Sequence, residues 1–149
     1  MLARAIIARA SAFIDMTPHD AKRLVSRWYQ EIWNQGRLDV ADEIFAPDYV
    51  HPGQTVTGPE SAKRVVEVYR TAFPDIHFTI DDMIEEGGRV ATRLTMTGTH
   101  LAAFDGIPPT GRRVEIQAIG IFEVRGGRLV RHWGVFDALG MRRQLGRLA

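Results

Sequence analysis

The chain has 149 residues, of which 45% are hydrophobic and 25% are charged, and its formal net charge is +1. These values predict one globular domain with a substantial core. They argue against nucleic acid or a membrane as partner, since nucleic acid and anionic lipid need excess Lys and Arg, and no apolar run approaches the roughly 20 residues of a membrane span. The sequence contains no cysteine, which excludes disulfides and thiolate chemistry within it, and we expect a cytoplasmic protein.

The first 13 residues are basic and contain no acidic side chain, which faintly resembles a targeting peptide. Arg9 interrupts the apolar core that a secretory signal needs. We therefore expect residues 1–16 to form an N-terminal arm and residues 17–149 to form a single domain. Met16 is an alternative start that the sequence leaves open.

Helices are predicted in the first half of the chain. Thr17 can cap free backbone N–H groups and is followed by a proline, which suits the first helical position. Apolar residues then recur at spacings of one, three and four until Gly36, a typical helix terminator. A short second helix is predicted over 38–45 and a third over 58–73, with a short extended piece at 49–51 between them.

From residue 76 the apolar periodicity changes to two, which is typical of half-buried strands. Two Gly-Gly turns, at 87–88 and 126–127, separate long alternating segments, and a loop covers 101–111. A last helix is predicted over 139–146. Helices followed by about four antiparallel strands predict an α+β fold, in which a curved antiparallel sheet wraps around the N-terminal helices as a cone-shaped α+β barrel.

Glycines interrupt three successive strands at Gly98, Gly120 and Gly134. The last two share the parity of large apolar neighbours, so they are expected to face inward. An inward glycine removes side-chain volume and so predicts a cavity, whereas a bulge without a cavity is the alternative.

Three motifs resemble those of the SnoaL-like polyketide cyclase family. Segment 98–111 reads Gly-Thr-His, a short gap, then Gly-Ile-Pro-Pro-Thr-Gly, like a loop of that family. The Phe-Pro-Asp at 73–75 is similar to its helix-to-strand corner, and 139–146 is similar to its closing Leu-Gly and Gln-Leu-Gly pairs. The resemblance covers roughly residues 21–146.

This resemblance implies a cone of the nuclear-transport-factor-2-like type with a deep apolar pocket, no cofactor and a homodimeric state. The best-known members close a ring of an anthracycline precursor by an aldol step, using an aspartate in the last strand and a histidine in the strand before it. Here those positions fall on Gly134 and Gly120. Related proteins of the fold act as hydroxylases. Four functions therefore stay open: cyclase or isomerase chemistry with relocated residues, hydroxylase-type tailoring, a non-catalytic binding module and a dimerisation domain.

Three residues are candidate acid/base groups. His132 has the inward parity of its strand, and a neutral imidazole can take or give a proton near pH 7. Asp137 ends the same strand and could act as a base, orient His132, or simply cap the last helix. His51, on the short extended piece, could reach a ligand at the mouth of the cone.

A cavity wall of aromatic and methionine side chains suits a small hydrophobic, aromatic ligand, although the same side chains are also typical of a filled core. For the histidine of the Gly-Thr-His motif, the alternative is a structural role in the loop. The predicted substrate-binding residues are Trp28, Trp33, Tyr49, Met96, His100, Phe104, Phe122 and Phe136.

No metal site and no cofactor are predicted, because the histidines lack metal-ligand spacing and no phosphate-binding glycine loop follows a strand. The outer sheet face is expected to carry several apolar residues and to form the homodimer interface. Its predicted members are Trp133, Thr95, Thr97, Ile119 and Ile121.

Overall fold

The computed structural model describes residues 17–147, so the predicted arm at 1–16 lies outside the described residues. The helical half comprises α2 (Pro18–Arg27), the π-helix η1 (Trp28–Asn34), α3 (Val40–Ile44) and α4 (Pro59–Ala72). The second half comprises β1 (His77–Glu86), β2 (Arg89–Thr99), β3 (Arg113–Arg125), β4 (Arg128–Phe136) and α5 (Ala138–Gln144). Within this part of the chain, no helix is both long and apolar enough to cross a membrane.

The first helix begins as the sequence predicts and then departs from the prediction. The Thr17 hydroxyl accepts a hydrogen bond from the Asp20 amide at 3.2 Å, and the Asp20 carboxylate accepts one from the Thr17 amide at 3.3 Å. At Trp28 the α-helix widens into the π-helix η1, which ends before Gly36 in a left-handed conformation. A uniform α-helix up to Gly36 was therefore the wrong expectation, because apolar spacing does not distinguish an α turn from a π turn.

The segment between α3 and α4 also differs from its prediction. Residues 49–51 form no strand. Instead, Phe45 makes an isolated parallel bridge with Leu129, and the Ala46 amide donates to the Leu129 carbonyl at 3.0 Å. This bridge joins the end of α3 to the beginning of β4, and so connects the helical wall to the edge of the sheet.

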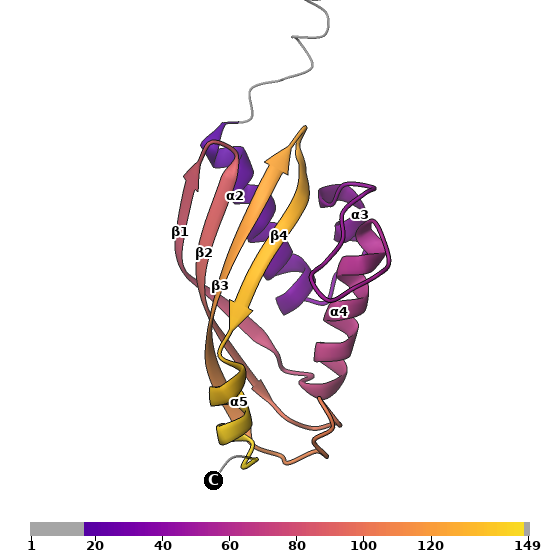
Figure 1. The fold of residues 1–149 in the computed structure, drawn as a ribbon, viewed down its shortest axis with the longest axis vertical. Helices are drawn as coiled ribbons and strands as arrows, with labels where there is room; N and C mark the ends of the chain where they lie inside the picture. Colours follow the sequence, from indigo (N-terminus) through magenta and orange to yellow (C-terminus); the bar gives the residue numbers. More distant parts are fainter. Residues whose placement is uncertain (1–16, 148–149) are drawn as a thin grey trace, which may run out of the picture.

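The four strands form one antiparallel sheet in the order β1-β2-β3-β4, and Figure 1 shows them side by side with the helices on one face. Bulges interrupt the β1–β2 and β3–β4 ladders, which is one way in which sheets bend. In the β3–β4 register, Gly120 lies opposite Gly134 and Phe122 lies opposite His132. The predicted α+β fold with a curved antiparallel sheet is confirmed.

The core fills the space between the inner face of the sheet and the helices, where burial of large apolar side chains supplies the main stabilisation. The largest fully buried side chains include Trp28, Tyr49, Phe45, Phe73, Phe122, Ile32, Ile44, Met96 and Leu129.

Gly98 has a different role from the other two strand glycines. A methyl group built on Gly98 would lie 3.1 Å from Cβ of Phe73, so this glycine allows the end of α4 to approach β2 closely. Gly120 and Gly134, in contrast, border a cavity. The prediction that inward glycines mark a cavity therefore fits two of the three positions.

Segment 100–112 and α5 close the lower end of the sheet in Figure 1. The His100 amide donates to the Arg112 carbonyl at 2.9 Å, which closes the base of this loop. The Gln144 side chain accepts from the Glu115 amide at 2.7 Å and donates to the Glu115 carbonyl at 2.8 Å. The glutamine of the closing motif thus holds α5 against β3.

Candidate functional site

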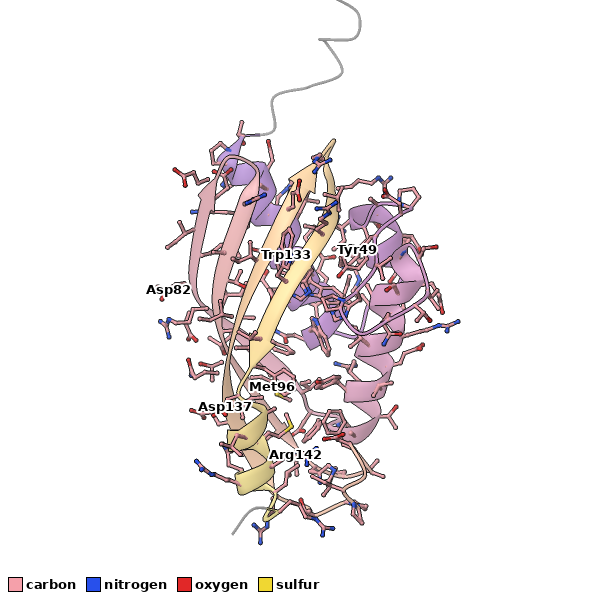
Figure 2. The ribbon with its side chains drawn as sticks, in the orientation of Figure 1. Tyr49, Asp82, Met96, Trp133, Asp137 and Arg142 are labelled. Carbon is pink, nitrogen blue, oxygen red and sulfur yellow. The ribbon has the colours of Figure 1, made fainter. Side chains whose placement is uncertain are left out.

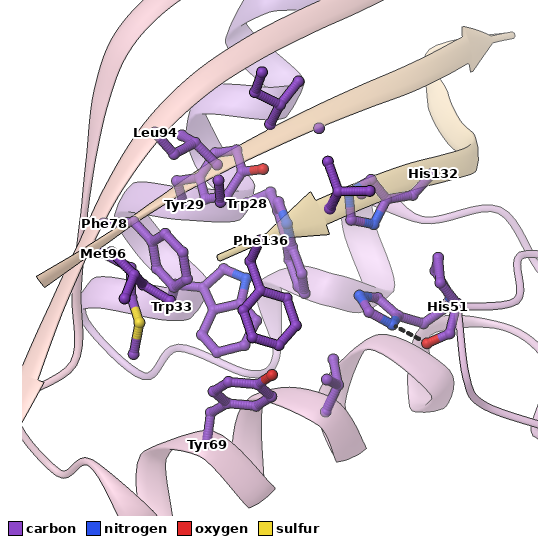
Figure 3. Close-up of a pocket in the computed structure, with 18 residues that line it drawn as sticks. Trp28, Tyr29, Trp33, His51, Tyr69, Phe78, Leu94, Met96, His132 and Phe136 are labelled. Atoms are coloured by element: carbon purple, nitrogen blue, oxygen red, sulfur yellow. Dashed lines mark hydrogen bonds between the residues drawn. The ribbon is translucent and has the colours of Figure 1, made fainter. Parts of the chain in front are cut away.

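A cavity of about 230 Å³ lies between the inner face of the sheet and the helices. None of the residues that line it is Asp, Glu, Lys or Arg, so its polarity comes from histidine rings, tyrosine hydroxyls and backbone groups. Figure 3 shows the labelled side chains of this cavity. Its principal lining residues are Trp28, Tyr29, Trp33, His51, Tyr69, Phe78, Leu94, Met96, Gly120, His132, Gly134 and Phe136.

The π-helix supplies the aromatic wall of the cavity. Trp28, Tyr29 and Trp33 all come from η1 and are all buried. The ring centroids of Trp28 and Trp33 are 5.4 Å apart at an edge-to-face angle, and Trp33 lies 4.9 Å from Phe78 on β1. Such contacts hold large rings in one orientation, so this wall is suited to a planar ligand.

His132 projects from β4 into the cavity. Its ring is parallel to that of Phe122, with centroids 4.2 Å apart, and lies 5.3 Å from the ring of His51. Burial, and to a smaller extent the neighbouring His51, lower the pKa of His132 to about 3. The imidazole is therefore neutral at pH 7. Its Nδ1 atom is buried and has no hydrogen-bond partner among residues 17–147.

His51 faces His132 from the segment that precedes α4. Its Nδ1 lies 3.0 Å from the Pro52 carbonyl, which can only accept, so Nδ1 carries the proton and Nε2 is left as an acceptor. Its backbone amide donates to the Ser61 hydroxyl at 2.7 Å, which holds this segment against α4. Burial lowers the pKa of His51, and the Pro52 hydrogen bond offsets part of this effect.

The ring of His132 lies over the two facing glycines. A methyl group built on Gly134 would lie 3.0 Å from His132 Nε2, and one built on Gly120 would lie 3.1 Å from the same atom. Larger side chains at these positions would collide with the ring in its present place. The family resemblance puts a catalytic aspartate and histidine at these two positions; here the imidazole of a third residue occupies the adjoining space.

A second and more polar cavity of about 620 Å³ lies along the outer edge of β4, next to segment 48–54. His51 and His132 line this cavity as well as the first one. Arg125, Arg131 and Asp48 are among its other lining residues. The two histidines therefore separate a hydrophobic interior from a polar space at the surface.

Of the three predicted acid/base residues, the structure brings His51 and His132 together but not Asp137. Figure 2 shows Asp137 where β4 meets α5. Its carboxylate accepts a hydrogen bond from the Gly140 amide at 2.7 Å, and the residue does not line the cavity. Its observed role is to cap α5, which is the alternative that the sequence left open.

Four of the predicted binding residues, Trp28, Trp33, Met96 and Phe136, line the main cavity, and their role in binding stays a prediction. Phe122 lies beneath His132. The other three lie elsewhere. Tyr49 is buried against Phe45 at a centroid distance of 4.4 Å, where burial raises the pKa of its phenol. Phe104 packs on Tyr69 at 4.8 Å, outside the main cavity.

His100 is fully buried and does not line the cavity. Its Nδ1 lies 3.1 Å from the Thr110 hydroxyl, and its ring lies 5.2 Å from that of Phe73. These contacts hold the two ends of the loop together and pack it on the end of α4. They agree with the loop-architecture alternative for this histidine.

Several lining residues were not among those predicted, namely Tyr69, Phe78, Val65 and Leu94. Each occupies an apolar position of its predicted helix or strand, so the sequence signal for facing inward was present. Periodicity does not distinguish a cavity wall from a filled core, and this is why they were missed. Among residues 17–147, no three His, Cys, Asp or Glu side chains gather into a potential metal site.

The fold and cavity define a class: a cone-shaped α+β protein with an interior cavity lined mainly by apolar and aromatic side chains. Residues 23–145 match the family of SnoaL-like polyketide cyclases, and the chain belongs to this family. It is 32% identical over 119 residues to nogalonic acid methyl ester cyclase of Streptomyces nogalater, an alignment that covers 76% of this chain and 89% of that protein.

Two solved structures extend the comparison. TsrD from Streptomyces laurentii superposes with a TM-score of 0.83 at 30% identity, covering 90% of this chain and all of that one. AclR from Streptomyces galilaeus, a candidate hydroxylase, superposes with a TM-score of 0.78 at 29% identity, covering 89% of this chain and all of that one. The fold is therefore similar to proteins associated with more than one kind of chemistry.

Proposed function

We propose that the protein is a cofactor-independent, cytoplasmic enzyme that acts on an aromatic polyketide or a similar hydrophobic carbonyl compound by acid/base chemistry of the cyclase or isomerase type. One observation carries this proposal: a neutral imidazole, that of His132, lies on the wall of an otherwise hydrophobic cavity. The likeness to a polyketide ester cyclase supports the substrate class.

The proposed reaction begins when His132 takes a proton from a carbon next to a ligand carbonyl. The resulting enolate attacks a second carbonyl carbon of the same molecule, which forms a carbon–carbon bond and leaves an alkoxide. The imidazolium then returns its proton to that alkoxide. The burial that lowers the pKa of His132 makes the ring a weak base for the first proton transfer and makes the return of the proton favourable, so His132 acts as a short-lived carrier.

His51 is proposed to exchange protons between His132 and the surface. His51 lines both the main cavity and the polar outer cavity, and its Nε2 is an acceptor. The two neutral rings have a centroid distance of 5.3 Å, so one proton can pass from one ring to the other. A positive charge on either ring is disfavoured by the neighbouring ring, so neither keeps the proton for long.

The first prediction concerns turnover. Replacing His132 by Gln keeps a polar side chain of similar size but removes the proton carrier, so conversion of an anthraquinone-type keto ester should fall by about 100-fold or more. Chromatographic measurement of product formation gives this rate.

Asp137→Asn is the matched control, because an amide oxygen can still cap α5 and the residue does not line the cavity. The rate of this variant should stay within about twofold of the wild-type rate. A His132→Gln variant with the rate of the wild type would overturn the assignment.

Hydroxylase-type tailoring is the second candidate. It is favoured by glycine at both positions where the resemblance puts the cyclase pair, and by the likeness to AclR. Incubation of the same ligand under labelled dioxygen distinguishes the two reactions, since only hydroxylation places the label in the product. Tight binding without conversion of any such ligand would favour the binding-module alternative.

We also propose that the protein is a homodimer through the outer face of the sheet. In the strand register, Ile84, Ala91, Ile121 and Trp133 form one row across all four strands. Several side chains of this face are large, apolar and exposed, including Val135 at 70%, which favours a covered surface over a solvated one.

A further inference from the structure

The recess at Gly120 brings together three polar side-chain atoms. We call this recess the Gly120 notch. A methyl group built on Gly120 would lie 3.1 Å from Nε2 of His132, 3.2 Å from the Thr92 hydroxyl and 3.2 Å from the Tyr29 hydroxyl. Tyr29, Gly120 and His132 line the main cavity, whereas Thr92 is buried behind them. The notch is thus a polar spot in a wall that is otherwise hydrophobic.

The hydrogen bonds behind the notch determine what it offers to a ligand. The Thr92 hydroxyl donates its single proton to the Gly120 carbonyl at 3.2 Å, which leaves its oxygen free to accept the proton of Tyr29. Burial raises the pKa of the Tyr29 phenol, so the phenol stays protonated. With its proton directed at Thr92, the Tyr29 oxygen can accept a further hydrogen bond.

His132 completes the set from the other side. The ring is neutral, so one nitrogen carries a proton and the other is an acceptor. Its buried Nδ1 has no partner within residues 17–147, and so no protein group fixes which nitrogen is protonated. Nε2 at the notch can therefore donate to a ligand oxygen or accept from it.

We infer that the Gly120 notch binds one hydroxyl group of the ligand, phenolic or enolic, which donates to the Tyr29 oxygen and accepts from His132 Nε2. Only a hydroxyl both donates and accepts through a single atom. A carbonyl oxygen would face the Tyr29 lone pairs without a proton between them, and a charged group would have no counter-charge among the lining residues. The inference rests on the proposed function for the location of the ligand, and adds a chemical group that the ligand must carry.

Each residue then has a defined part in recognition. Tyr29 and His132 contact the hydroxyl directly. Thr92 is a positioning residue, because it directs the Tyr29 proton away from the ligand. Gly120 determines specificity, because any side chain at this position would fill the notch.

The test compares two probes that differ only in the group at issue. 2-Naphthol and 2-methylnaphthalene have the same ring system, with a hydroxyl and a methyl group of similar size. Equilibrium dialysis at pH 7 gives a Kd for each, and the ratio of the two Kd values is the readout. Relative to wild type, Tyr29→Phe and Gly120→Ala should each shift this ratio by about tenfold against 2-naphthol.

Tyr29→Phe keeps the buried ring, and its thermal unfolding shows whether the fold is intact. Val65→Ile is the control, because it adds one methylene to the cavity wall on α4 and should shift both Kd values alike. If both probes bind but the ratio is the same in all four proteins, the notch does not bind a hydroxyl, while the proposed function stands. If neither probe binds the wild type up to its solubility, both proposals are overturned.

Discussion

His132 owes its chemistry to the groups that surround it. Phe122 covers one face of the ring, His51 lies beside it, and Gly120 and Gly134 lie beneath Nε2. None of these neighbours provides a negative charge, so burial is not compensated and the ring stays neutral. A carboxylate in place of either glycine would favour the imidazolium instead, and the proton would be held rather than passed on.

This environment predicts a pH-dependent stability. The folded-state pKa of about 3 lies below the ordinary value of 6.5, so between these pH values the unfolded chain binds a proton that the folded chain does not. The free energy of unfolding should therefore fall as the pH is lowered through this window, by at most about 1.4 kcal/mol per pH unit from this group. Above pH 6.5 the contribution is constant.

Urea unfolding of the wild type and of His132→Gln at pH 7.5 and pH 5 measures the effect. Carboxylates titrate in both proteins and cancel in the comparison, so the wild type should lose more stability than the variant between the two pH values. An equal loss in both proteins would show that His132 is as easily protonated in the folded chain as in the unfolded one.

For single residues, strand parity was sufficient to predict that His132 points inward, because His132 and Gly134 both lie beyond the bulge that interrupts the β3–β4 ladder. It could not predict the contact with His51, which depends on how the irregular segment after α3 lies against β4. The role of Asp137 was also ambiguous. An aspartate between a strand and a helix looks the same in the sequence whether it caps the helix or acts as a catalytic base.

Among the secondary-structure elements, α5 gives a direct test of that ambiguity. Asp137→Ala removes the side chain that accepts from the Gly140 amide, and should lower the free energy of unfolding by about 1 kcal/mol. Asp137→Asn should keep most of this stability, because Asn caps helices about as well as Asp. Thermal or urea unfolding distinguishes them. Equal destabilisation by both variants would show that the negative charge itself, and not the cap, is what α5 requires.

The elements of the chain were predicted to different degrees. The Gly-Gly turns and the alternation of apolar residues were sufficient for four strands, and Thr17 marked the beginning of α2. The widening of α2 into η1 was not predictable, because apolar spacing along the chain is compatible with both an α turn and a π turn. The extended piece at 49–51 was overpredicted, since its neighbours offer only the single bridge at Phe45.

At the scale of the whole molecule, the outer sheet face carries the homodimer prediction. Trp133 is 46% exposed, lies 5.9 Å from the Arg89 guanidinium, and forms the β4 end of the apolar row. Trp133→Lys would place a charge in the buried interface and should convert the dimer into a monomer, which sedimentation velocity at micromolar concentration measures.

Val68→Lys is the control for this experiment. Val68 is 57% exposed on α4, in the other layer of the molecule, so the same change there should leave the oligomeric state unaltered. A Trp133→Lys variant that sediments like the wild type would contradict an interface on this face, and an increase in thermal stability of that variant would indicate a solvated surface.

The overall architecture was predictable because three motifs agreed with one another and with the order of helices and strands. Their role is now visible: segment 98–111 and Gln144 close the lower end of the sheet, and the corner at 73–75 turns α4 into β1. The cavity was less predictable. Its volume depends on the balance between large rings and two glycines, which is a property of the assembled layers and not of any one segment.

The π-helix makes the aromatic wall tolerant of a change in chain length. A π turn holds about one residue more than an α turn, so η1 contains a surplus residue. Loss of one exposed residue there, such as Gln30, would let the segment rewind as an α-helix. Trp33 would keep nearly the same direction relative to Trp28, because five steps of a π-helix and four steps of an α-helix both turn the chain by about 400°. A single-codon deletion in η1 would thus change the residues between the two indoles while both indoles stay on the cavity wall.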